Sequence, residues 1–449
     1  MSVNSKHDRL IHEPMSDLPD RDSPKNLLRQ ARESLKTARD EGRISEDEFG
    51  VIAEIVNAYD ENRPSTPPPK GKSHNEGTTL KAWCNRLRLV AERLEVDLTE
   101  ATEDDINQLW DDILSGNHPD VKDSGLSPNT VTARQSTVRR FYEFHDELGV
   151  DPEQLSVIAP EKNNVDERDV YTGEEIDAMR ECINHPRDRC LFDLLVYTGQ
   201  RLRAVQTLRV KDIDLDDGTF YLNNDAGGLK GAGGKRPLLG AEASVREWLD
   251  YHPNPEPDAY IITQRPDYRA DADGSSPLTQ KSIRRLLDRI VDDAGIDKPS
   301  NPHNFRHSFV TIAKRNYGMD DSTIKGLIGH RLESRVMEEV YSHLKDDDHV
   351  RAAQEATGIR EPDEESPLSP DFCPTCDEPL PDRAKACSRC GTMFTPDAKS
   401  AKQQMDQDLH ESKGEANATD DELGQQAIEH LKDEIKQNPE LMNALLDEL

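Results

Sequence analysis

Two proline-rich segments divide this chain of 449 residues and limit what each part can fold into. The first is the run PSTPPP at 64–69, and the second, at 361–370, combines Pro with acidic residues. Proline fixes the backbone and lacks an amide donor, so such runs form stiff linkers rather than helices or inner strands. Because one hydrophobic core rarely grows past about 250–300 residues, we expect two or more domains with terminal extensions.

Hydrophobic spacing between these linkers is mainly helical. Residues 78–160 repeat Leu, Trp and Val every three or four positions, which is typical of amphipathic helices. In 165–352, helices alternate with a hairpin in which 218–222 and 236–239 flank a glycine-rich turn. The sequence therefore predicts a mainly α fold with a small β-sheet or hairpin, an α+β class. The expected parts are a partly helical extension at 1–63, a linker at 64–77, a helical domain at 78–160, an α+β domain at 165–352, a linker with a cysteine-rich segment at 361–395, and an acidic tail with an amphipathic helix at 396–449.

The net charge of −32 comes from 57 Lys and Arg against 89 Asp and Glu. Phosphate contacts need Lys and Arg, so this charge would normally argue against a nucleic-acid partner. The excess of Asp and the scarcity of Lys are typical of proteins from salt-loving archaea, since at 1 M salt a Debye length of about 3 Å damps the self-repulsion. An acidic mesophilic protein with a solvated surface is the alternative. Local basic patches, rather than the net charge, must decide whether the chain binds DNA.

Targeting signals are not evident. No apolar run approaches the ~18–20 residues of a membrane span, and the N-terminal segment lacks the apolar stretch of a signal peptide. Seven cysteines, an odd number, argue against a closed disulfide framework. We therefore expect a cytoplasmic protein without a membrane partner.

One basic segment stands out inside the acidic chain. Ser127-Pro128 provides a favoured N-cap and first helical residue, which predicts a helix over 129–148. This helix carries aromatic residues and the basic side chains Arg134, Arg139 and Arg140. The three arginines are candidate DNA contacts, and an ordinary amphipathic helix with a solvated Arg face is the alternative.

Several side chains in the α+β domain suit phosphoryl transfer. They are Arg201, His303, Arg306, His330 and Tyr341. A Tyr hydroxyl can attack phosphorus, paired arginines can clamp the phosphate oxygens, and histidines can move protons near neutral pH. Each alone could be a surface Arg, a solvated helix face or a core Tyr, but their order along the chain is hard to obtain by chance.

A hairpin lysine would complete this chemistry by protonating the leaving oxygen. Lys230 and Lys235 both lie on the glycine-rich hairpin, and the residues alone leave the choice between them open. Arg and Lys would supply the positive charge, so the site needs no acidic metal cluster.

These motifs resemble the catalytic domain of the tyrosine recombinase, or phage-integrase, family. Thr198-Gly199-Gln200-Arg201 is similar to the family's first box, and the run from His303 to Phe309, HNFRHSF, to its second. Leu327-Ile328-Gly329-His330 resembles its Leu-Gly-His motif, and Tyr341-Ser342-His343 its nucleophile motif. Residues 78–160 are similar to the family's helical core-binding domain.

The resemblance implies a role for each matching residue. Arg201 and Arg306 would clamp the phosphate, Tyr341 would be the nucleophile, and His303 and His330 would assist proton transfer. Lys230 best matches the family's hairpin lysine and general acid. The implied activity is site-specific cleavage and rejoining of double-stranded DNA through a 3′-phosphotyrosyl intermediate, without ATP, by a homotetramer on two DNA sites at the nucleoid. A topoisomerase-like relaxing enzyme and a DNA-binding regulator that does not cut are the alternatives.

Four cysteines near the second linker have the spacing of a metal site. Cys373, Cys376, Cys387 and Cys390 form two CxxC pairs separated by ten residues. Each pair can grip one side of a tetrahedral Zn²⁺, and the segment is too short for a core of its own. With four protein ligands the zinc would be structural, and the segment resembles a zinc ribbon. Incidental thiols and a redox pair are the alternatives.

Overall fold

The computed structural model describes two compact parts of the chain, Met1–Asn163 and Asn164–Leu449, which are treated separately here. The described residues are 20–62, 66, 77–160, 166–222, 227–229, 232–269, 272–315, 319–331, 333–334, 337, 373, 386–387 and 389–393. Within these ranges, no helix combines the length and the apolar character that crossing a membrane requires. Lys230, Tyr341, Cys376 and the tail at 396–449 lie outside the described residues.

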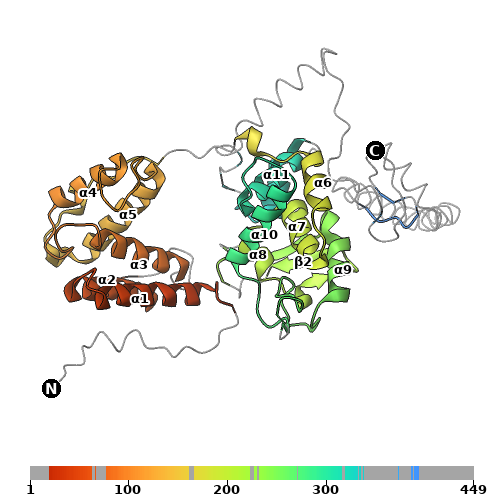
Figure 1. The fold of residues 1–449 in the computed structure, drawn as a ribbon, viewed down its shortest axis with the longest axis horizontal. Helices are drawn as coiled ribbons and strands as arrows, with labels where there is room; N and C mark the ends of the chain where they lie inside the picture. Colours follow the sequence, from red (N-terminus) through yellow and green to blue (C-terminus); the bar gives the residue numbers. More distant parts are fainter. Residues whose placement is uncertain are drawn as a thin grey trace, which may run out of the picture. The chain divides into compact units, whose positions relative to one another are not determined.

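The first unit is helical (Figure 1). Its α-helices are α1 (Pro24–Asp40), α2 (Glu46–Asp60), α3 (Gly77–Ala91), α4 (Glu103–Ser115) and α5 (Pro128–Phe144), with 3₁₀ turns at Asp146–Leu148 and Pro152–Gln154. Ser23 caps α1 by accepting from the Asn26 amide, and Ser45 and Glu48 cap α2 reciprocally in a capping box. Ser127 is the N-cap of α5, as its pairing with Pro128 predicts.

The linker predicted at 64–77 does not separate two cores. Leu35 of α1, Phe49 of α2, Leu80 of α3 and Phe141 of α5 belong to one buried cluster. The apolar stripe of α1 packs along α3, and α2 packs on the same helix. The separate N-terminal extension is therefore corrected: the helices within 20–62 complete the core of the helical unit.

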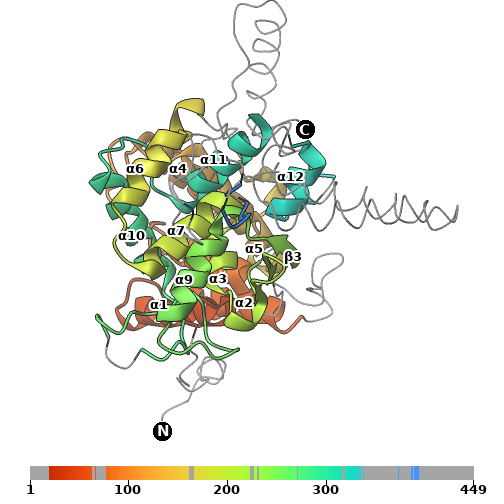
Figure 2. The same cartoon turned by 90° about the vertical axis from the view of Figure 1, so that its right-hand side faces the viewer.

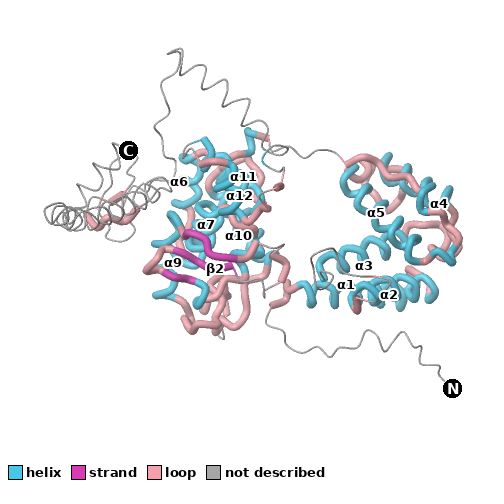
Figure 3. Tube along the Cα trace, turned by 180° about the vertical axis from the view of Figure 1, so that it is seen from behind, coloured by secondary structure: helices cyan, strands magenta, loops and turns pink. Residues whose placement is uncertain are grey.

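The second unit combines helices with a small sheet, whose strands are magenta in Figure 3. Its α-helices are α6 (Gly173–Glu181), α7 (Pro186–Thr198), α8 (Leu202–Gln206), α9 (Glu242–Tyr251), α10 (Gln280–Asp293), α11 (Pro302–Arg315) and α12 (Asp321–Ile328), with 3₁₀ turns at Glu167–Asp169, Val210–Asp212 and Leu239–Ala241. The strands β1 (Ile213–Asp214), β2 (Thr219–Leu222) and β3 (Gly234–Pro237) form an antiparallel sheet in that order. The mainly α class with a small sheet is confirmed.

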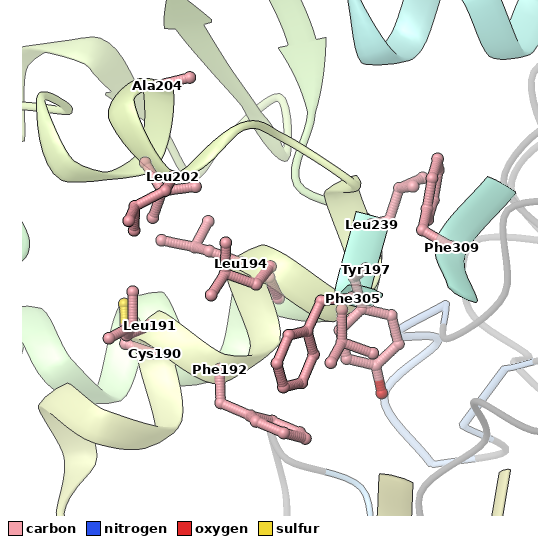
Figure 4. Packing of buried hydrophobic residues seen from close by; sticks show 14 of the residues in the cluster. Cys190, Leu191, Phe192, Leu194, Tyr197, Leu202, Ala204, Leu239, Phe305 and Phe309 are labelled. Carbon is pink, nitrogen blue, oxygen red and sulfur yellow. The ribbon is translucent and has the colours of Figure 1, made fainter. Parts of the chain in front are cut away.

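Helix α7 is the centre of this unit. It lies between α9 and α11 (Figure 1, Figure 2), and its residues from Cys190 to Thr198 are all buried. Phe192 of α7 meets Phe305 of α11 edge to face, with ring centroids 5.8 Å apart (Figure 4). This contact fixes the first turns of α11, which carry the second predicted motif, against the middle of α7, whose end leads into the first.

Candidate phosphate site

Gly199 joins the first two motifs. It ends α7 in the left-handed conformation, with φ of +57°, and a Cβ placed there would lie 2.3 Å from Cδ1 of Phe309 on α11. Its carbonyl accepts a hydrogen bond of 2.9 Å from Nη1 of Arg306. Only glycine fits both the backbone and the aromatic ring above it. The turn after α7 is thereby fastened to α11.

Arg201 and Arg306 reach the site from these two motifs. Arg201 is the N-cap residue of α8, half-buried, and its Nη1 is a buried atom without a hydrogen-bond partner in the described structure. Arg306 is buried on the second turn of α11, whose first amides are capped by the side chain of Asn301. A buried guanidinium nitrogen without a partner costs stability unless a ligand supplies an acceptor.

His330 completes the cluster from the end of α12. Gly329 ends that helix in the left-handed conformation, and the Nε2 of His330 then lies 2.7 Å from Nη2 of Arg306. Burial, followed by the charges of Arg306 and Arg201, lowers the pKa of His330 to about 4. Its Nδ1, like the Nη1 of Arg201, is buried without a partner among the described residues.

The electrostatics of this cluster favour an anion. Besides the two arginines, Lys325 and His303 also lower the pKa of His330, and no carboxylate is among the causes. The chain has a net charge of −32, yet positive charges and unsatisfied hydrogen-bond donors gather at this place. Such a cluster is a preorganised site for an oxyanion. Sequence analysis predicted these residues; the structure brings Arg201, Arg306 and His330 together.

A single carbonyl links three parts of the site. The oxygen of Leu327 accepts from Nε2 of Gln200 at 2.8 Å and from Nε of Arg236 at 3.0 Å. Gln200 precedes Arg201, Arg236 lies on β3, and Leu327 lies at the end of α12. A Cβ at Gly329 would lie 2.6 Å from Cβ of Ala232, so the hairpin also approaches α12 closely. Sequence reasoning missed Gln200 and Arg236, because only contacts far apart in the chain reveal them.

The structure describes only some of the remaining residues that were predicted to be catalytic. His303 is exposed at the start of α11, and its ring stacks on that of His307 with centroids 5.8 Å apart. Lys235 is exposed, and its Nζ lies 2.8 Å from Oδ2 of Asp217. This carboxylate raises the pKa of Lys235 and makes it a weaker acid. Lys230 and Tyr341 lie outside the described residues.

The three arginines predicted on α5 have unlike surroundings. Arg139 pairs with Glu153 at 3.0 Å, and Arg140 pairs with Glu143 at 2.9 Å. Arg134 is buried, with 9% of its surface exposed, and it faces α3 instead of forming a solvated stripe. The arginine side chains of α5 therefore do not form one continuous basic face.

Three of the four predicted metal ligands converge. The sulfur atoms of Cys373, Cys387 and Cys390 lie within 4.8 Å of one another, and the amide of Arg389 donates to Sγ of Cys387 at 3.3 Å. Thiolates brought together by a short turn form a donor set that suits a metal ion such as Zn²⁺. These cysteines could therefore bind a metal, and Cys376 lies outside the described residues.

Comparison with known proteins points to one family. Residues 170–348 match the model of the phage integrase family. The tyrosine recombinase XerC of Oceanobacillus iheyensis is 28% identical over 245 residues, which is 51% of this chain and 74% of that protein. Tyrosine recombinase XerD of the same organism is 25% identical over 234 residues, 50% of this chain and 74% of that protein.

Solved structures of similar proteins include two recombinases with DNA. The XerH site-specific recombinase bound to its difH substrate, in a pre-cleavage complex, is 18% identical with a TM-score of 0.44, covering 76% of this chain and 98% of that one. A lambda integrase tetramer bound to a Holliday junction is 15% identical with a TM-score of 0.45, covering 62% of this chain and 77% of that one.

Proposed function

We infer that residues 170–348, a domain of the phage integrase family, make this chain a tyrosine-type site-specific recombinase, an enzyme that breaks and rejoins DNA strands. The assignment depends on the cluster of Arg201, Arg306 and His330. In this cluster Nη1 of Arg201 and Nδ1 of His330 are buried without a hydrogen-bond partner in the described structure. Such a site suits a phosphodiester, whose non-bridging oxygens accept from guanidinium groups. The residue roles below are our proposal.

Tyr341 is the proposed nucleophile. Its oxygen attacks the scissile phosphorus and forms a 3′-phosphotyrosyl bond, while the P–O5′ bond breaks and leaves a 5′-hydroxyl. The tyrosine proton goes to a nearby base, and Lys230 gives its proton to the leaving 5′ oxygen. A 5′-hydroxyl of the partner strand then attacks the phosphotyrosine and restores the tyrosine. Each bond broken is replaced by one of the same kind, so no ATP is needed.

Arg201 and Arg306 stabilise the charge of the pentacoordinate transition state. Arg306 is held by the Gly199 carbonyl and the His330 ring, so little reorganisation is needed when the phosphate enters. His330, neutral when the site is empty, and His303 would contact the phosphate or relay protons. Arg236 and Gln200, joined through Leu327, position the hairpin and the first motif.

A suicide substrate tests the proposal. A nicked duplex carrying the target site loses its 5′ fragment on cleavage, so the covalent protein–DNA adduct accumulates. We expect the wild type to form this adduct and Tyr341→Phe to bind the duplex without forming it. Binding without any adduct in the wild type would favour a non-cutting regulator. Relaxation of supercoiled DNA that lacks the site would favour a topoisomerase-like enzyme.

The partner and the assembly follow from this chemistry. Exchange between two duplexes breaks four strands, and each protomer supplies one tyrosine, so we propose a homotetramer on two DNA sites. The helical unit, including 78–160, would hold double-stranded DNA together with the catalytic domain at 165–352. The proposed place of action is the cytoplasm, at the nucleoid, where the DNA is.

The cysteine cluster is proposed to bind one structural zinc. Cys373, Cys387 and Cys390 would supply three thiolates and Cys376 the fourth. A closed four-ligand site has no open position for a substrate, so the ion would hold the segment at 361–395 together as a zinc ribbon.

The acidic composition is proposed to be an adaptation to salt, as in halophilic archaea. With 89 acidic and 57 basic side chains, self-repulsion falls as salt shortens the Debye length. We expect folding and cleavage to be optimal above about 0.5 M KCl, with loss of near-ultraviolet circular dichroism at about 0.1 M. Full folding and activity at about 0.1 M, with steep loss above about 0.3 M, would contradict this proposal.

A further inference from the structure

Three arginines gather between α3 and α5 of the helical unit. Arg86 of α3 donates from Nη1 to Oγ1 of Thr137 on α5 at 3.2 Å. Arg134 precedes Thr137 by three residues and so lies on the same face of α5. Arg93 lies in the turn that follows the end of α3 at Ala91. Helix α3, the turn after it and helix α5 thus bring the charges of Arg86 and Arg93 close to Arg134.

These arginines repel one another. Arg86 and Arg93 are the charges that, after burial, lower the pKa of Arg134 to about 10. Burial also lowers the pKa of Arg86 and of Arg93. Asp120 is the carboxylate that acts on Arg93, and Nη2 of Arg93 reaches only its backbone carbonyl, at 3.4 Å. Holding these charges together costs stability that no nearby ion pair offsets.

Several other arginines of the same unit are paired with carboxylates. Arg32 lies 2.8 Å from Asp60, Arg88 lies 2.7 Å from Glu92, and Arg139 and Arg140 pair with glutamates. Within the described residues, Arg86, Arg93 and Arg134 make no such ion pair. In a chain with 89 acidic residues, three unpaired, partly desolvated arginines are an exception that needs a physical reason.

Unsatisfied donors point to a ligand. Arg134 is 9% exposed, and its guanidinium forms no ion pair with a carboxylate among the described residues, while Nη1 of Arg93 is a buried atom without a hydrogen-bond partner there. An anion with several acceptor oxygens would satisfy these donors and cancel the repulsion at once. A phosphate group offers oxygens that guanidinium forks bind well, often with two parallel hydrogen bonds.

We propose that Arg86, Arg93 and Arg134 form a phosphate-binding site, and that the phosphate is one of the DNA backbone. The assignment to DNA rests on the proposed function, since a recombinase must hold the duplex outside its catalytic site. Phosphate contacts fix the register and orientation of a protein on DNA without reading the sequence. The site would therefore anchor the helical unit on the duplex at one defined phosphate.

Thermal unfolding of the full chain tests the site itself. Potassium phosphate and KCl are compared at equal ionic strength, so that general screening is the same. We expect phosphate to raise the Tm of the wild type above its value in chloride, and Arg93→Gln to lose most of that difference. Arg32→Gln, which removes an arginine paired with Asp60, is the matched control and should keep it. Equal Tm values in both salts for the wild type would overturn the site.

Binding to DNA tests the source of the phosphate. With a mixed-sequence 40-base-pair duplex, Arg93→Gln should weaken the affinity for DNA about tenfold, which is the scale of one charge-assisted contact. The slope of log K for DNA binding against the log of the salt concentration should become shallower by about one, because one phosphate contact is lost. Arg32→Gln should change affinity less than about twofold. Unchanged affinity in Arg93→Gln, with the phosphate effect on Tm intact in the wild type, would overturn the assignment to DNA.

Two further experiments distinguish failure of this site from misfolding and from failure of the proposed function. Arg134→Gln, a more buried change, should reproduce Arg93→Gln in both measurements, and its circular dichroism reports whether it folds. Covalent adduct formation by the wild type on a suicide substrate tests the catalytic proposal independently. An adduct formed normally by the wild type, together with wild-type DNA affinity in Arg93→Gln, would reject the assignment of this site to DNA and leave the recombinase function standing.

Discussion

Nη2 of Arg306 lies 2.7 Å from Nε2 of His330 and donates a hydrogen bond to the ring. A guanidinium has donors but no acceptor, so Nε2 must be the unprotonated nitrogen of a neutral imidazole. The proton then sits on Nδ1, a buried atom with no partner in the described structure. The site thus holds a neutral histidine whose buried Nδ1–H has no acceptor among the described residues.

This relationship predicts how His330 titrates. Burial, followed by the charges of Arg306 and Arg201, lowers its pKa from 6.5 to about 4. The unfolded chain binds the proton more readily, so this residue should make the free energy of unfolding rise with pH between about 4 and 6.5. A nuclear magnetic resonance titration of the imidazole, assigned with His330→Asn, should show a neutral ring at pH 7. Bound DNA should raise the pKa, since a phosphate brings negative charge.

A titration midpoint near 6.5 that does not respond to DNA would contradict the account of this site. His145, whose ring nitrogens contact Glu147 and the Val51 carbonyl in the helical unit, provides an internal reference in the same spectra. Its chemical shift should not follow phosphate bound at the catalytic cluster.

Gly199→Ala should destabilise the catalytic domain more than an ordinary left-handed glycine does. The new Cβ would lie 2.3 Å from Cδ1 of Phe309, so the ring must move in addition to the backbone strain at φ of +57°. Gly295→Ala is the matched control, because Gly295 has φ of +69° and no atom within 4 Å of the Cβ position. We expect about 1–2 kcal/mol of strain in the control and about 1–3 kcal/mol more at Gly199. Urea unfolding of both variants measures this, and equal losses would refute the contact.

The hairpin lysines should differ sharply in cleavage. Lys235 is bound to Asp217, so Lys235→Ala should have a small effect. Lys230→Ala should slow cleavage about 10²–10⁴-fold, as loss of a general acid does. A 5′-phosphorothiolate substrate has a leaving group that needs no proton and should rescue Lys230→Ala. Rescue of Lys235→Ala, with no rescue of Lys230→Ala, would reverse the assignment.

Zinc should be bound at one ion per chain and should not take part in catalysis. Native mass spectrometry of the full chain should show this ion, and Cys376→Ser combined with Cys390→Ser should lose it. Cys182→Ser, which changes the residue that ends α6, is the control and should keep it. The zinc-free double variant should still cleave DNA. If removing zinc abolished covalent adduct formation, a purely structural ion would be untenable.

Sequence patterns located most of the helices, and the structure brings the two arginines of the predicted site, Arg201 and Arg306, close to His330. Leu28 and Leu35 have the helical spacing that α1 shows, and Asn301-Pro302 marks the start of α11. Strand β1 and helix α9 were missed: β1 has two residues, and α9 carries no strong start signal. Motif order placed Arg201 and Arg306 in one site, because family motifs carry information about contacts between distant segments.

Contacts between distant segments set the limit of such reasoning. The Leu327 carbonyl that joins Gln200 to Arg236 is a backbone atom, and no residue pattern marks it. The periodicity of α5 predicted a basic helix but not which arginines would find carboxylates, so Arg134 differs from Arg139 only through its neighbours on α3. The linker at 64–77 was taken as a domain boundary because proline interrupts helices, yet a break in the helix is not a break in the core.

The most direct measurement is the identity of the residue that carries DNA. A suicide substrate incubated with the full chain traps the adduct, and digestion with a protease and a nuclease leaves one peptide bearing a nucleotide. Tandem mass spectrometry should place the nucleotide on Tyr341 through its 3′-phosphate, and Arg306→Ala should reduce the yield of that peptide by orders of magnitude. A nucleotide on any other residue, or an unchanged yield in Arg306→Ala, would contradict the proposed site.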